Sequence, residues 1–159
     1  MIIRLLTKIF GESENFGDYL YRWTIARFWG GRALYLHKIV SGDWSRHLHD
    51  HPKRFTVLML SGGYIETSIR RTGYEGTEVP THATKGVFVN TTKTPYQAPC
   101  LRSFAAAHIH RIMDTMNGRP CWTLVYTGPR VRDWGFWVDG NFVESSEYGR
   151  EYIDKGLNI

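Results

Sequence analysis

Histidines placed two residues apart are the feature of this sequence with the clearest chemical potential. Three of the seven histidines are His47, His49 and His51, and His108 and His110 repeat the spacing later in the chain. Side chains on an extended strand alternate between its two faces, so histidines at alternate positions point the same way. Imidazoles that share one face of a strand can bind one transition-metal ion together. The spacing therefore predicts a metal site.

A longer pattern surrounds the first group of histidines. His49 and His51 are followed after three or four residues by Phe55 or Thr56, and six residues further on by Gly62-Gly63. This order resembles the first motif of the cupins, in which His-x-His is followed by a glutamate and then by a glycine. If His47 and His49 formed the pair instead, the closing position would not be a glycine. The resemblance therefore favours the pair at positions 49 and 51.

The second cupin motif contributes one further histidine from a later strand, and His110, after the small residues 105–107, resembles it. The resemblance covers about residues 41–113. It implies a cupin fold: a double-stranded β-helix, or jelly-roll barrel. It assigns the metal to His49, His51 and His110, with His47 and His108 as the alternatives if the register is shifted by two residues.

The usual glutamate ligand is missing, because neither Phe55 nor Thr56 supplies a carboxylate. A three-histidine site resembles that of the thiol dioxygenases within the cupins, and it leaves coordination positions open for substrate. The resemblance implies one divalent transition metal, with iron expected first and nickel, manganese or zinc as alternatives. It also implies a dioxygenase-type oxidoreductase or an isomerase that acts on a small organic substrate. The alternative is a non-catalytic cupin module that binds or senses a small molecule or a metal.

Glu66 follows Tyr64 on the same face of a predicted strand, so it is a candidate acid–base group or fourth ligand. The competing interpretation of Glu66 is an ordinary surface glutamate. Asp50 lies between the proposed ligands and is expected to support the loop, or to hydrogen-bond an imidazole. Candidates for substrate binding are Tyr64, Arg102 and Arg111. Residues with expected structural roles are His37, His82, Trp134, Phe136 and Trp137.

The composition is that of a folded protein with one core, with 159 residues, 42% hydrophobic and 22% charged. The net charge of +5 is spread along the chain without a long block, which favours a solvated surface over nucleic-acid binding. Cys100 and Cys121 are expected to be reduced. The N-terminal segment lacks signal-peptide features, and no run is long enough to span a bilayer, so we expect a cytoplasmic protein. Cupins often pair through their sheets, so a homodimer is expected.

The pattern of the chain predicts one all-β domain over residues 1–159 with a helical N-terminal extension over 1–30, a β-barrel over 31–144 and a tail over 145–159. Helices are expected over residues 2–9 and 17–28, each followed by glycine. Short runs rich in branched and aromatic residues predict strands. They are residues 32–40, 55–60, 64–69, 86–89, 101–107, 122–127 and 134–143. Hairpin turns are expected at Gly62-Gly63 and at residues 139–141, and a polar loop at 72–84.

Overall fold

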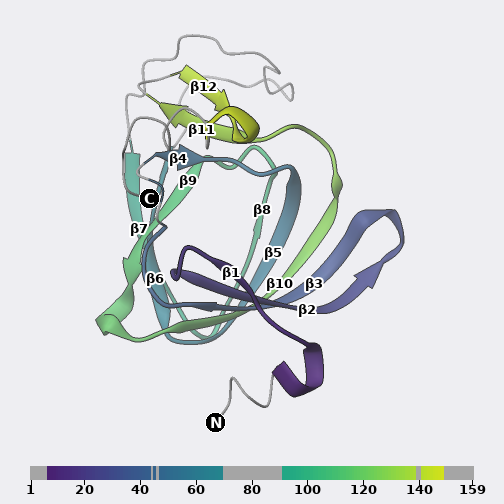
Figure 1. Ribbon diagram of the computed structural model, residues 1–159. Coiled ribbons are helices and arrows are strands. Elements are labelled where there is room, and N and C mark those ends of the chain that lie inside the picture. The colour runs from purple at the N-terminus through teal and green to yellow at the C-terminus, as the bar shows by residue number, and fades with distance from the viewer. Residues whose placement is uncertain (1–6, 44, 46, 70–90, 139–140, 149–159) are drawn as a thin grey trace.

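The protein is built from two six-stranded antiparallel sheets that face each other, as a computed structural model shows (Figure 1). The structure describes residues 7–43, 45, 47–69, 91–138 and 141–148. In spatial order, the first sheet contains β1 (Glu14–Phe16), β2 (Leu20–Phe28), β3 (Arg32–Ile39), β10 (Cys121–Arg130), β5 (Lys53–Ser61) and β8 (Cys100–Phe104). The second contains β12 (Asn141–Glu144), β11 (Gly135–Val138), β4 (Leu48–His49), β9 (His110–Thr115), β6 (Gly63–Ile69) and β7 (Thr91–Gln97). The fold is all-β, as predicted.

Buried and exposed side chains alternate along the central strands of the first sheet, and the buried ones contribute to the core. On β5, Val57 and Met59 are buried while Leu58 and Leu60 are exposed, as expected for a strand with one inner and one outer face. The buried residues of the core come from both sheets: Ile39, Val57, Met59, Tyr64, Phe104, Cys121 and Val125. These residues therefore pack between the two sheets, and Ile39, Val57, Tyr64 and Val125 also line the cavity between them.

Residues 17–28 do not form the predicted helix. Leu20–Phe28 is strand β2, which pairs with β3 along eight positions. The register shifts between Thr24 and Ala26, and this bulge breaks the alternation of inner and outer residues. The interrupted alternation imitated a helical period, although tyrosine, tryptophan, threonine and isoleucine favour strands. The expected helical extension over 1–30 is therefore wrong for residues 14–28, which belong to the first sheet.

Most of the predicted strands are present. The predictions over 32–40, 55–60, 64–69, 101–107 and 122–127 correspond to β3, β5, β6, β8 and β10, and the run 134–143 divides into the hairpin of β11 and β12. Strands β1, β4, β7 and β9 were not predicted. Residues 2–6, the expected strand 86–89, the loop 72–84 with His82, residues 139–140 and the tail beyond 148 lie outside the described residues.

Short helical stretches complete the described chain. Residues 7–10 and 145–148 are helical, and 3₁₀ turns η1 (Trp29–Gly31) and η2 (Met116–Gly118) connect strands. Within the described residues, no helix is long and apolar enough to cross a membrane. Tyr148 is only 4% exposed, so the start of the predicted loose tail packs on the domain.

The turn between β5 and β6 requires glycine. Gly62 has a φ of +72°, and a Cβ added there would lie 2.5 Å from the carbonyl oxygen of Pro120. Both the left-handed backbone and this close approach exclude other residues. A turn is therefore present at Gly62-Gly63, but the predicted hairpin is wrong, because β5 and β6 lie in different sheets and the turn connects the two sheets. Both cysteines are free, with Cys121 buried and Cys100 partly buried.

Candidate metal and ligand site

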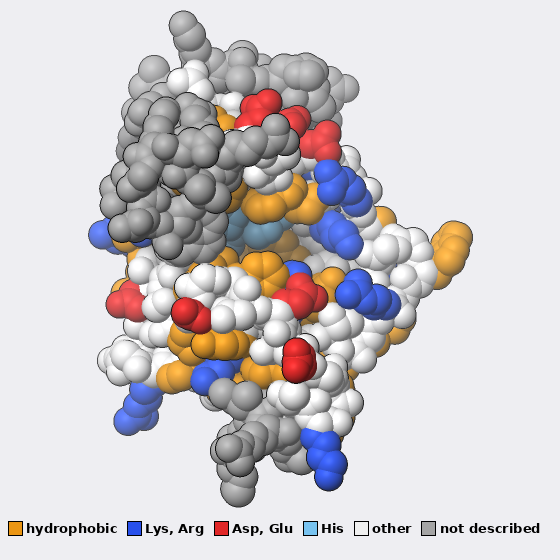
Figure 2. Space-filling model, viewed as in Figure 1, with side chains coloured by type: hydrophobic (Ala, Val, Ile, Leu, Met, Phe, Trp, Pro, Cys, Tyr) orange, Lys and Arg blue, Asp and Glu red, His pale blue; other side chains and the backbone are white. Residues whose placement is uncertain are grey.

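A cavity of about 450 Å³ lies between the two sheets. It opens on the face shown in Figure 2, where histidine side chains lie in the hollow and hydrophobic side chains surround them. The residues that line it come from both sheets and from the segments that connect them. They include Phe16, Tyr19, Arg22, Tyr35, His37, Asp43, His49, His51, Lys53, Phe55, Tyr64, His110, Thr123 and Trp134.

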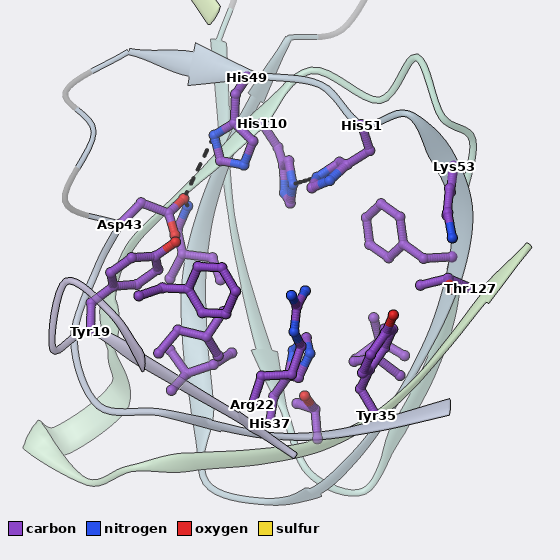
Figure 3. Close-up of a pocket in the computed structure, with 18 of the residues that line it drawn as sticks. Tyr19, Arg22, Tyr35, His37, Asp43, His49, His51, Lys53, His110 and Thr127 are labelled. Atoms are coloured by element: carbon purple, nitrogen blue, oxygen red, sulfur yellow. Dashed lines mark hydrogen bonds and ion pairs between the residues drawn. The ribbon is translucent and has the colours of Figure 1, made fainter. Parts of the chain in front are cut away.

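Three histidines meet at one end of this cavity (Figure 3). His49 on β4 is the direct cross-strand partner of His110 on β9, and His51 follows two residues later. One imidazole nitrogen from each of these residues lies within 4.8 Å of those of the other two. The structure therefore brings together the three residues that the resemblance selected, and their spacing suits a group that can hold one metal ion.

Backbone contacts hold His51 in place beside β9. The N–H of His51 donates to the carbonyl oxygen of Ala106 at 2.9 Å, so the connection before β9 anchors the residue. The His51 ring packs edge-on against Phe55, with 4.6 Å between the ring centroids. Its Nε2 atom then lies 2.7 Å from Nε2 of His110. The small residues 105–107 noted in the sequence thus allow the close approach of these two segments.

The protonation of the imidazoles favours metal binding. Burial lowers the pKa of His49 to about 3, and burial also lowers the pKa of His51 well below its usual value. Both rings are therefore neutral at physiological pH, and neutral imidazole is the form that binds metals. The Nδ1 atom of His49 is buried without a hydrogen-bond partner, and the nearest carboxylate oxygen, from Asp43, is 3.9 Å away. An unpaired nitrogen in this position fits a metal ligand.

Glu66 forms hydrogen bonds with two histidines, His110 and His108. Its Oε2 atom lies 2.8 Å from Nδ1 of His110, and its Oε1 atom lies 2.9 Å from Nε2 of His108. Burial opposes ionisation of Glu66, but the hydrogen bonds with His108 and His110 outweigh it and lower the pKa of Glu66 to about 2. The carboxylate therefore accepts a hydrogen bond from Nδ1–H of His110, which leaves the Nε2 lone pair free to face His51. Glu66 is fully buried, so its interpretation as a surface glutamate is wrong.

Glu66, His108 and His110 form a second group with metal-binding geometry. In this group the two imidazoles already hydrogen-bond the carboxylate, and neither Glu66 nor His108 lines the cavity. By contrast, His49, His51 and His110 all line it. A metal that must accept substrate therefore fits the three-histidine group better, and Glu66 and His108 serve to orient His110.

Asp50 fastens the short segment between His49 and His51 to β11. Its side chain is fully buried and accepts hydrogen bonds from Nη1 of Arg132 at 2.7 Å and from the N–H of Gly135 at 3.0 Å. Its own N–H donates to the carbonyl oxygen of Gly135 at 3.1 Å. The expected role of Asp50 in supporting the loop matches these contacts. Among the hydrogen bonds of the described residues, those of Asp50 involve no imidazole.

We expect Asp50→Ala to lower the free energy of unfolding by about 3–5 kcal/mol, because Arg132 would lose its buried partner. Asp133→Ala is a matched control, since Asp133 is exposed and pairs with Arg130 on the surface. Loss of an exposed pair of this kind should cost less than about 1 kcal/mol. Urea denaturation of both variants measures the difference. Equal destabilisation by the two substitutions would show that the Asp50 pair does not anchor the segment.

The structure separates the remaining candidates. His47 lies outside the cluster, with Nδ1 2.9 Å from the hydroxyl of Tyr148. Tyr64 is buried and lines the cavity, whereas Arg102 is exposed over the ring of Tyr96. Among the described residues that line the cavity, neither Arg102 nor Arg111 appears.

The aromatic residues between positions 134 and 137 were expected to have structural roles. Phe136 has such a role, because it stacks on Tyr148, but Trp134 contacts His49 in the cavity wall.

Several residues were not identified as cavity residues from the sequence, and the reason differs among them. Arg22 lies in the segment mistaken for a helix, so its inward direction was hidden. His37 was interpreted as an ordinary residue, although it lies on a correctly predicted strand and faces the cavity. Asp43 and Lys53 are next to the histidine segment, but their directions depend on loops and registers that a single sequence does not specify.

The sequence matches no protein-family model, and no curated protein matches it. Solved structures are similar in fold. Oxalate decarboxylase of Lactobacillus farciminis, in a formate complex, gives a TM-score of 0.52 at 12% identity over 93% of this chain and 38% of that one. Streptomyces PAC13, solved with uridine, gives 0.53 at 12% identity over 87% of this chain and 92% of the other. The FeII form of HppE gives 0.50 at 8% identity over 72% and 54%.

These similarities, together with the two facing six-stranded sheets, establish the class of the protein: it has the cupin fold, a double-stranded β-helix. At 8–12% identity the likeness concerns the fold alone. The chain spans 38% of the oxalate decarboxylase chain and 54% of the HppE chain. Within this fold, the histidine group is a possible metal site.

Proposed function

We propose that this protein is a mononuclear metal-dependent enzyme, of the dioxygenase or isomerase type, that acts on a small organic substrate. The observation that carries the proposal is the convergence of His49, His51 and His110 at one end of a cavity of about 450 Å³. A purely structural metal site is closed by its protein ligands, whereas a catalytic one keeps positions open. Three ligands that face a cavity support the catalytic kind.

The residues present fit a divalent transition metal. The donors are imidazoles, which suit iron, nickel, copper and zinc, and they carry no charge that would offset that of the ion. When bound, such an ion supplies Lewis acidity and open positions for substrate or a small co-substrate. Glu66 orients His110, and Asp50 holds the segment that carries His49 and His51. Phe55 packs against His51, and Trp134 lies beside His49.

Iron is the first choice among the metals. The fold-level neighbour HppE was solved in an FeII form, and neutral nitrogen ligands on one face suit Fe(II). Zinc, nickel and manganese remain alternatives with the same ligands. An isomerase would need only the Lewis acidity of the ion, whereas a dioxygenase would also need a position for O₂. Metal identity therefore decides which reaction type is tested first.

The experiment is anaerobic titration of metal-free protein with Fe(II), followed by addition of nitric oxide as a probe of open coordination positions. We expect about one Fe(II) per chain, and an electron paramagnetic resonance signal from the nitrosyl adduct that marks an open position. Oxygen uptake is then measured over a panel of small organic acids, alcohols and thiols. Stoichiometric Fe(II) with nitric oxide binding but no turnover of any substrate would favour a binding or sensing module. Failure to bind any of the four metals would overturn the proposal.

A further inference from the structure

Three polar side chains form a row across the first sheet, on the side of the cavity away from the histidine group. Arg22 on β2 is the cross-strand partner of His37 on β3, and His37 is in turn the partner of Thr123 on β10. Directly paired residues of adjacent strands lie on the same face of a sheet. All three line the cavity, and Figure 3 shows Arg22 and His37 projecting into it opposite the histidines. We call these residues the polar row.

Each member of the polar row carries a buried polar atom without a hydrogen-bond partner. They are Nε of Arg22, Nε2 of His37 and Oγ1 of Thr123. Thr123 is only 1% exposed. An unpaired buried donor or acceptor destabilises the folded protein, so three in a row need an explanation. A ligand in the cavity that hydrogen-bonds all three provides one.

The neighbouring row nearer the start of β2 is apolar, so the polar row differs from it. In that row, Leu20 pairs with Ile39, and Ile39 pairs with Cys121; on the other side, Tyr35 pairs with both Thr24 and Val125. Apolar side chains at the positions of the polar row would also have filled the space between the neighbouring rows. Polar groups placed at one level of an apolar cavity are typical of sites that fix the orientation of a small ligand.

Arg22 is held in position before any ligand arrives. Its guanidinium lies over the rings of Phe16 and Tyr35, with centroid distances of 4.4 and 4.8 Å, and one terminal nitrogen forms a salt bridge with Glu14. These contacts leave Nε without a partner. A guanidinium fixed on two ring faces loses little further conformational entropy when it binds an anion.

The chemistry of the row selects an anion. Arg22 is a permanent cation and donor, while His37 and Thr123 can each donate one hydrogen bond. The other cavity cation, Lys53, donates to the carbonyl oxygen of Gly31, and the cavity carboxylate of Asp43 lies beside His49, away from the row. A carboxylate has only acceptor sites and can receive all three hydrogen bonds.

We infer that the polar row of Arg22, His37 and Thr123 is a subsite for the carboxylate of a small organic acid, whose other end reaches the three-histidine group. The inference rests on the proposed function only in calling this acid the substrate, because the subsite itself needs no metal. Tyr35 lies beside the polar row and Phe55 packs against His51, so aromatic rings at both ends of the cavity favour an acid with an apolar or aromatic body.

The test measures binding to metal-free protein in the presence of EDTA, so that no carboxylate can bind through a metal. The probes are benzoate, phenylacetate, 3-phenylpropionate, butyrate and hexanoate, each compared by calorimetry with its neutral amide. We expect at least one acid to bind at least about tenfold more tightly than its amide. Arg22→Gln should weaken the binding of that acid by about 10- to 100-fold, and Thr123→Val should weaken it by about 3- to 10-fold.

Thr56→Val is the matched control, because Thr56 hydrogen-bonds Ser103 on the exposed face of the same sheet. It should bind the acid as the wild type does. If every acid binds no better than its amide, or if Thr123→Val and Thr56→Val bind equally well, the inference is overturned. Metal content is measured separately on each variant. Acid binding without metal binding would contradict the proposed function and support this subsite. Metal binding without acid binding would support the proposed function and contradict this subsite.

Discussion

Replacing His49 or His51 by alanine is expected to reduce the bound metal from about one ion per chain to less than about one tenth of an ion. Each histidine supplies one of the three nitrogens that lie within 4.8 Å of one another. Loss of a direct ligand should weaken binding by more than the 10- to 100-fold typical of a supporting residue. His49→Ala is suitable because His49 Nδ1 has no hydrogen-bond partner that the substitution would remove. Elemental analysis after dialysis against Fe(II) or Zn(II) measures the effect.

Thermal unfolding provides a second measurement of the same ligands. Metal at about one hundred times its dissociation constant should stabilise the wild type by about 2.7 kcal/mol, which corresponds to a rise in Tm of roughly 5–10 °C. The alanine variants should show no such rise. His47→Ala is the control, because His47 contacts Tyr148 outside the cluster, and it should retain both the metal and the rise in Tm. Loss of metal in His47→Ala but not in His51→Ala would place the ligands in the other register.

Replacing Glu66 by leucine is expected to lower the free energy of unfolding by about 3–5 kcal/mol. The substitution keeps most of the side-chain volume but removes both oxygens, so His108 and His110 would lose their partner in the interior. Glu66→Gln keeps one acceptor for His110 and should cost about 1–3 kcal/mol. Urea denaturation of the metal-free proteins measures both values.

The same pair of variants separates stability from orientation of the metal ligand. If Glu66 fixes the tautomer of His110, Glu66→Gln should bind metal about 10- to 100-fold more weakly than the wild type while remaining folded. Glu147→Gln makes the same chemical change at an exposed position and should alter neither property. A Glu66→Gln protein with unchanged metal affinity would mean that the carboxylate stabilises the fold without orienting His110.

The sequence predicted those parts of the fold and site whose signals are local. The period of two at positions 49 and 51 depends only on strand geometry, so these residues could be paired before their partners were known. His110 required the resemblance, because nothing local connects it with a segment 59 residues away in the chain. Strands such as Lys53–Ser61 were found since their branched and alternating residues suit a half-buried strand.

What the sequence did not predict depends on register between distant strands. The bulge between Thr24 and Ala26 shifts the phase of β2, so Arg22 was assigned to a helix and its place in the cavity was missed. Glu66 was noted on the same face as Tyr64, but whether that face was inner or outer was not decided by the alternation alone. The polar row is visible only after β2, β3 and β10 are aligned, because its three residues are far apart in the chain.

The strand β4 is only two residues long, and its link to β9 is the pairing of His49 with His110. Such a contact closes a long loop, and contacts of this kind contribute little until most of the surrounding sheet has formed. The unfolded chain therefore has no metal site, and the site is completed late in folding. An ion that binds there would lower the rate of unfolding, and so lengthen the lifetime of the folded protein, while leaving the rate of folding nearly unchanged.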